Sequence, residues 1–140
     1  MSDGCVFCRI ISHDAAGRIV YEDGLTVAFV DRRQVTPGHT LVVPRRHVRD
    51  IFELDGATGA ALMLTTVRIA AAVRDAFGCE GISTWQQNGA SAGQEVFHMH
   101  VHVMPRHAGD GLLRIYAAPP SMPDGEELDA MARSIRAALG

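Results

Sequence analysis

The amino-acid sequence predicts an α+β fold, in which short antiparallel strands combine with two helices. Short β-branched and apolar runs recur between turn signals, which is typical of strands joined by hairpins. Two segments, 55–77 and 126–139, carry helix signals instead. Because strands outnumber helices and short turns favour antiparallel pairing, we expect the α+β class.

The first part of the chain predicts three strands. Residues 18–22 and 25–30 flank Asp23-Gly24, which is a two-residue hairpin signal. A second turn signal then leads into the β-branched run 39–43. We expect a hairpin followed by a third strand.

The middle of the chain predicts one long helix and two further strands. Apolar residues recur at helical spacing over 55–77, and Gly78 provides the stop. Residues 81–87 predict the fourth strand. The small-residue loop 88–93 then leads to the fifth strand, a run within 97–106 that contains three histidines.

The last part of the chain predicts a loop and a helix. Residues 107–125 are rich in Gly and Pro, and we expect a loop there with one short strand over 112–116. Asp124 and Glu127 form a capping-box pattern, which predicts a helix over 126–139.

Composition excludes several classes of protein. The 140 residues carry a net charge of −3, which argues against nucleic acid as a partner. No run approaches the ~20 apolar residues of a membrane span, and residues 1–5 lack the features of a secretory signal. No linker or repeat interrupts the sequence. We therefore expect one domain, 1–140, in the cytoplasm, with no membrane partner.

Two of the three cysteines form the pattern Cys5-x-x-Cys8. In a chain without an export signal, this spacing favours metal binding or redox chemistry over a disulfide framework. No βαβ pattern accompanies the pair, so half of a structural zinc site is the stronger interpretation. Cys79 is expected to pack at the end of the long helix.

Three histidines, His98, His100 and His102, alternate along the fifth strand, so they are expected to share one face. The opposite, core face would hold the intervening apolar residues Phe97, Met99, Val101 and Val103. Three imidazoles are costly to desolvate without partners, so the row indicates a reactive site. Two chemistries are open: a zinc centre, or nucleophilic catalysis by a neutral imidazole.

The loop before the histidines favours nucleophilic catalysis on phosphorus. Small residues let backbone N–H groups approach an anion closely, and side-chain amides can bond phosphoryl oxygens. The segment supplies both kinds of residue, at Gln87, Asn88, Gly93 and Gln94. Only Glu95 is a carboxylate nearby, whereas a zinc hydrolase would more often surround its metal with several.

Three segments together carry a family resemblance. Residues 94–106 resemble the signature of the histidine triad (HIT) family, 5–11 resemble its N-terminal segment, and Asp31 with 36–48 resembles its central segment. The resemblance implies a sheet of about five antiparallel strands, a long central helix and a C-terminal helix. It also implies a homodimer that joins two such sheets.

The resemblance assigns catalytic roles to four residues. His100 matches the family nucleophile, which attacks the α-phosphate of a nucleotide and forms a nucleotidyl-histidine that water hydrolyses. His102 matches a histidine that contacts the phosphate and helps the leaving group. His39 matches a histidine near the triad, and Gln94 a residue that bonds the phosphate region. The implied reaction is hydrolysis of a nucleoside phosphoramidate or dinucleoside polyphosphate, releasing AMP or another nucleoside monophosphate.

Other residues match the family's purine-nucleotide pocket. Asp31 matches the ribose contact, although an Asp here could also cap a turn. Phe7 and Phe29 match the apolar cleft for the base, although both could be core residues. The remaining expected nucleotide contacts are Gln87, Asn88, Gly93 and Glu95.

Glu95 departs from the best-known branches of the family, which place Ser or Thr directly after the glutamine. A carboxylate that points into a phosphate site would repel the substrate. We therefore expect Glu95 to point outward or to contact the leaving group, in which case it would favour an amine.

Bacterial members with the cysteine pair resemble zinc binders, which implies a structural Zn²⁺ site with four ligands: Cys5, Cys8, His47 and His98. Three other functions stay open at the level of sequence. They are a nucleotidyl transferase, a purine-nucleotide-binding or signalling module with little turnover, and a hydrolase with zinc on all three histidines.

Overall fold

The computed structural model describes residues 4–112 and 118–140. The chain divides into two compact units, Met1–Asp110 and Gly111–Gly140, each of which is described by itself. Apart from its first residue, the strand expected over 112–116 lies outside the described residues. The single domain expected over 1–140 stays a prediction.

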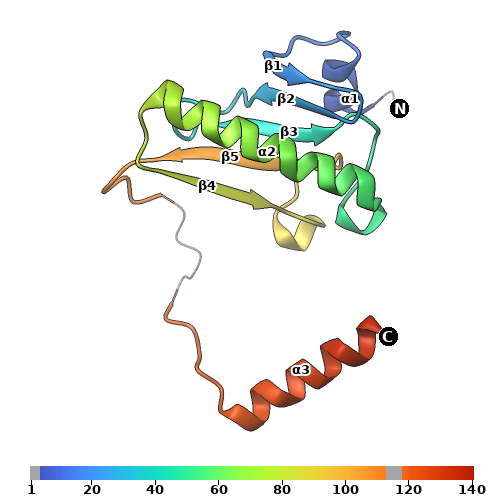
Figure 1. The fold of residues 1–140 in the computed structure, drawn as a ribbon, viewed down its shortest axis with the longest axis vertical. Helices are drawn as coiled ribbons and strands as arrows, with labels where there is room; N and C mark the ends of the chain where they lie inside the picture. The colour runs from blue at the N-terminus through green and yellow to red at the C-terminus, as the bar shows by residue number, and fades with distance from the viewer. Residues whose placement is uncertain (1–3, 113–117) are drawn as a thin grey trace. The chain divides into compact units, whose positions relative to one another are not determined.

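The first unit is built on a five-stranded sheet in the order β1-β2-β3-β5-β4 (Figure 1), in which every neighbouring pair is antiparallel. The strands are β1 (Ile19–Glu22), β2 (Thr26–Val30), β3 (Thr40–Pro44), β4 (Gly81–Gln86) and β5 (Val101–Arg106). A long helix separates β3 from β4, and β5 returns to lie between them. The predicted α+β class and antiparallel sheet are confirmed.

Helix α2 (Gly56–Phe77) lies across one face of the sheet (Figure 1). Asp55 caps its N-terminus by accepting the Thr58 N–H at 2.9 Å. Gly78 ends it with a left-handed φ of 58°. By length and composition this helix could cross a membrane, contrary to the expectation from sequence. Its buried side chains instead form a core with the sheet, including Leu62, Ile69, Ala28 and Val42.

Helix α1 (Val6–Ile11) covers the other face, where its Phe7 and Ile11 pack on Phe29 and Leu41. Along β2, Ala28 belongs to the core under α2 and Phe29 to the core under α1, as strand alternation requires. Sequence reasoning missed α1 because six residues are too few to show helical periodicity. The second unit contains α3 (Gly125–Leu139), whose predicted capping box is present.

The histidine segment differs from the prediction. Strand β5 begins only at Val101, so His102 lies in the strand while His98 and His100 precede it. The Met99 N–H bonds the Val48 carbonyl at 2.7 Å, a partner outside the strand ladders. Alternation still holds for Met99, Val101 and Val103, which pack under α2. Phe97 was wrongly assigned to the core: its side chain is 39% exposed, beneath the Arg49 guanidinium.

Candidate functional site

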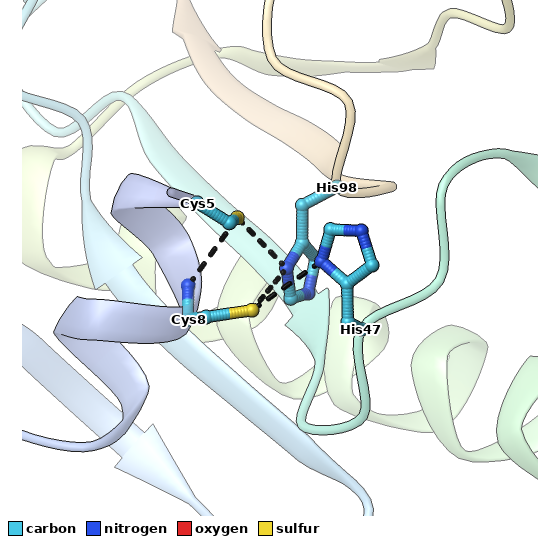
Figure 2. A group of neighbouring side chains, drawn as sticks. All are labelled: Cys5, Cys8, His47 and His98. Atoms are coloured by element: carbon cyan, nitrogen blue, oxygen red, sulfur yellow. Dashed lines mark hydrogen bonds between the residues drawn. The ribbon is translucent and has the colours of Figure 1, made fainter. Parts of the chain in front are cut away.

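Four sulfur and nitrogen ligands meet between α1, the loop after β3 and the segment before β5 (Figure 2). The Nδ1 atom of His98 lies 3.5 Å from the Sγ atoms of both Cys5 and Cys8. The Nδ1 atom of His47 lies 3.3 Å from Cys8 Sγ. All four side chains point toward one another, as the resemblance implied.

The donor set and spacing of this cluster fit zinc. Usual Zn–S and Zn–N bond lengths place the sulfur and nitrogen atoms of a tetrahedral site about 3.5 Å apart. The Nε2 atom of His98 donates to the Pro44 carbonyl at 2.8 Å, which leaves Nδ1 as the atom for a metal. Burial lowers the pKa of His98 to about 4, so its imidazole is neutral, as a metal ligand must be.

His100 is oriented for attack by one backbone bond. Its Nδ1–H donates to the His98 carbonyl at 2.8 Å, so the lone pair lies on Nε2. Burial is the main cause that lowers the pKa of His100 below 6.5. A neutral imidazole with a lone pair on Nε2 is the nucleophilic form. The rings of His100 and His102 are 4.9 Å apart, centre to centre.

His102 is held by His39 and by a tryptophan. Its Nδ1 lies 2.9 Å from His39 Nε2. Its other support is Trp85, whose ring stacks face to face with the imidazole at 4.3 Å, because the two residues are cross-strand partners on β4 and β5. Burial lowers the pKa of His102 to about 3 and also lowers that of His39.

Asp31 lies at the end of a row of polar contacts that runs from His102 through His39. Its Oδ2 lies 3.8 Å from His39 Nδ1, which makes no hydrogen bond within the described residues. The nearby carboxylate favours a proton on that nitrogen, so His39 Nε2 accepts from the Nδ1–H of His102. Asp31 Oδ1 accepts the Arg33 N–H at 2.9 Å and caps a turn. One carboxylate thus serves the turn and the histidines, and the predicted ribose contact stays a prediction.

Gln94 is buried and holds the loop before the histidines together. Its Oε1 accepts the Gly89 N–H at 2.7 Å, and its Nε2 donates to the carbonyls of Arg49 and Val96. Both amide hydrogens are therefore used inside the protein. Gln94 braces the loop in this structure, and its predicted contact with phosphate stays a prediction.

Two other residues predicted in the loop have structural roles. Asn88 accepts the Ile51 N–H at 2.8 Å and exchanges side-chain bonds with Gln86. Gly93 has a φ of +85°, and a Cβ there would lie 2.7 Å from Gln87 Nε2. The positive φ favours glycine at 93, and the absence of a Cβ lets the Gln87 side chain lie against the backbone.

Phe7 and Phe29 are core residues in this structure, exposed by only 7% and 2%. Their rings meet edge to face at 5.2 Å. Phe7 also meets His100 edge to face at 5.2 Å, so the core reaches the nucleophile. Their predicted contact with a base stays a prediction.

Sequence reasoning missed two contacts at the site. Trp85 stacks on His102. The one sequence feature that could have indicated this contact is that Trp85 lies in β4, the strand that pairs with β5. Arg33 donates to Glu95 at 2.7 Å, a contact between two loops that no local sequence pattern indicates. Glu95 is exposed and so points outward, one of the two expected placements, while its contact with the leaving group stays a prediction.

Comparisons with known proteins show what this chain is similar to. The HIT domain model matches residues 12–109. A crystal structure of a HIT family member from Bacillus subtilis is 37% identical, with a TM-score of 0.91 and 99% of each chain covered. A Zn-bound histidine triad family protein from Mycobacterium smegmatis is 37% identical, with a TM-score of 0.74 and 97% and 95% covered. Adenylylsulfatase HINT3 from Arabidopsis thaliana is 32% identical over 112 residues, covering 80% of this chain and 57% of that protein.

Proposed function

Because the chain belongs to the histidine triad (HIT) family, we propose that it is a nucleotide hydrolase in which His100 is the nucleophile. The observation that carries the proposal is the 2.8 Å bond from His100 Nδ1–H to the His98 carbonyl. This bond leaves Nε2 unprotonated, and burial keeps the ring neutral by lowering the pKa of His100. The adenylylsulfatase name of the Arabidopsis relative supports cleavage of a bond to a nucleoside 5′-phosphoryl group.

The proposed reaction has two displacements at the α-phosphorus. His100 Nε2 forms a bond to phosphorus while the bond to the leaving group breaks, and the leaving group takes the electron pair and a proton. Water then attacks the nucleotidyl-histidine, which releases a nucleoside monophosphate such as AMP and restores the imidazole. The proton that the leaving group takes comes from solvent or from the substrate itself. His102 supports the second displacement, since its Nδ1–H bonds His39 and its unprotonated Nε2 can take a proton from the attacking water.

Zinc is the proposed cofactor, held by the four-residue cluster of Cys5, Cys8, His47 and His98. The zinc-bound relative from M. smegmatis supports this proposal. The metal would tie α1 to the segment that bears the nucleophile. Its role would be structural, because His98 contacts the metal cluster with its side chain and His100 with its backbone carbonyl.

A homodimer is the proposed assembly in the cytoplasm. Strand β4 lies at one edge of the sheet, where a second copy could extend it. Helix α2 exposes Met63, Leu64 and Val67 by 60% or more, an apolar surface that a second copy could cover. Light scattering should give twice the chain mass, and Leu64→Glu should shift it toward one chain. A single-chain mass for the wild type would contradict the dimer.

A turnover assay tests the function. Wild type, His100→Ala and His107→Ala are given adenosine 5′-phosphoramidate or diadenosine tetraphosphate, with and without brief EDTA. His107 is an exposed histidine outside the site, so its loss controls for removal of an imidazole. AMP release that disappears only in His100→Ala and survives EDTA supports the proposal. Tight AMP binding without release from either substrate would favour a binding module instead.

A further inference from the structure

An ion pair at the rim of the histidine site has no part in the chemistry above. Arg33 Nη2 lies 2.7 Å from Glu95 Oε2, and the two side chains are 68% and 66% exposed. Arg33 lies in the turn after β2, and Glu95 lies in the loop before β5. The pair thus joins two segments that are 62 residues apart in sequence.

Both partners extend from fixed backbone. The Asp31 carboxylate accepts the Arg33 N–H at 2.9 Å. On the other side, Gln94 bonds the backbone of Gly89, Arg49 and Val96 directly before Glu95. The two long side chains can therefore separate without disturbing either segment. Because exposed ion pairs contribute little to folding stability, a charged ligand can compete for either partner.

The turn that carries Arg33 is joined to the histidine site by short contacts. The Asp31 carboxylate, which accepts the Arg33 N–H, lies 3.8 Å from His39 Nδ1, and His39 Nε2 lies 2.9 Å from His102 Nδ1. Burial is the main cause of the lowered pKa of His102, and Arg33 lowers it further. The charge of Arg33 is therefore close enough to act on a ligand bound at His102.

We propose that Arg33 selects a leaving group that carries phosphate, by exchanging the Glu95 carboxylate for a phosphate of that group. This inference rests on the proposed hydrolase function. A guanidinium matches phosphate with two parallel hydrogen bonds, and phosphate brings more negative charge than a carboxylate does. Glu95 then turns to solvent. An amine leaving group would instead have to displace Arg33 from Glu95 and would then lie beside the Arg33 cation. The Arg33–Glu95 ion pair therefore favours a phosphate leaving group, whereas Glu95 alone was expected to favour an amine.

The test compares kcat/KM for diadenosine tetraphosphate and adenosine 5′-phosphoramidate in wild type, Arg33→Ala, Glu95→Gln and Arg32→Ala. Loss of the charged bonds from Arg33 should lower the tetraphosphate value by about tenfold or more, with a much smaller effect on the phosphoramidate. Glu95→Gln removes the competitor and should raise the tetraphosphate value. Arg32→Ala removes the same charge from an exposed neighbour and should preserve the ratio of the two values.

Two outcomes would overturn the proposal, and they differ from failure of the hydrolase. An equal fall on both substrates in Arg33→Ala, with weaker AMP binding by calorimetry, would mean that Arg33 holds the α-phosphate. Unchanged kcat/KM values for both substrates in Arg33→Ala would mean that Arg33 does not contact the leaving group. If the wild type releases no AMP from either substrate, the hydrolase function itself fails and this proposal fails with it. Melting temperatures equal to that of the wild type would exclude misfolding.

Discussion

The backbone carbonyl of His98 accepts the Nδ1–H of His100 at 2.8 Å, while the side chain of His98 points at the two cysteine sulfurs. One residue thus belongs to the metal cluster through its imidazole and orients the nucleophile through its main chain. Loss of metal should therefore act on catalysis through the position of His100. It should not remove a step of the reaction.

Cys8→Ser should lose bound zinc and lower the melting temperature by about 5–10 °C, because a structural metal site contributes directly to folding. Cys79→Ser is the matched control, since Cys79 is also buried but lies outside the cluster. Elemental analysis and thermal unfolding check this. Less than half an equivalent of zinc in wild type never exposed to chelator would contradict the metal assignment.

The pH profile of kcat/KM should have its acidic limb below pH 6.5. The pKa of His100 is lowered from 6.5, mainly by burial, so the neutral nucleophile persists as the pH falls through that value. Protonation at lower pH removes the lone pair and the activity. Initial rates between pH 5 and 8 measure the limb, and a half-maximal rate above pH 7 would show that His100 is not the neutral group inferred here.

Trp85→Ala should lower kcat by about two- to tenfold, because the stacked ring restricts His102 and such a contact contributes about 0.5–1.5 kcal/mol. Trp85→Phe retains an aromatic face and should restore most of the rate. A positioning role predicts a change in kcat with little change in KM, and steady-state kinetics separate the two. Equal kcat values in wild type and Trp85→Ala would show that the stack is only packing.

Gly93→Ala should be more destabilising than Gly78→Ala. Both glycines are left-handed, with φ of 85° and 58° and ψ of 16° and 33°, so each alanine costs about 1–2 kcal/mol. Only at Gly93 would the added Cβ also meet Gln87, at 2.7 Å, while Gly78 has open space. Urea unfolding of both variants measures the difference. Equal losses would indicate that Gln87 moves away without cost.

Sequence patterns predicted the parts of the fold that depend on local residues or on a regular alternation of apolar side chains. The turn at Asp23-Gly24 and the Gly78 stop act locally, and both are present, although the turn also takes in Leu25 and is one residue longer than predicted. Alternation predicted which side of the sheet Met99 and Val103 would face. It could not show that the strand ladder begins only at Val101, because that depends on a long-range bond from Met99 to Val48.

The sequence allowed us to predict which residues gather at the site. It did not allow us to predict which contacts they make with one another. Resemblance to the family placed His39, His47 and the histidine triad together, which no local pattern could do. The use of the Gln94 amide inside the loop depends on which backbone groups lie near it after folding. The stack of Trp85 on His102 depends on strand register, and the Arg33–Glu95 pair on loop positions.

The most direct test of the account is to look for the covalent intermediate. Wild type is mixed with diadenosine tetraphosphate, quenched within the first turnover under non-acidic conditions, and digested for mass spectrometry. We expect one adenylyl group on the peptide that contains His98, His100 and His102, localised by fragmentation to His100 and absent from His100→Ala. Full-rate AMP release by His100→Ala, or an adenylyl group on another residue, would contradict the assignment of His100 as nucleophile.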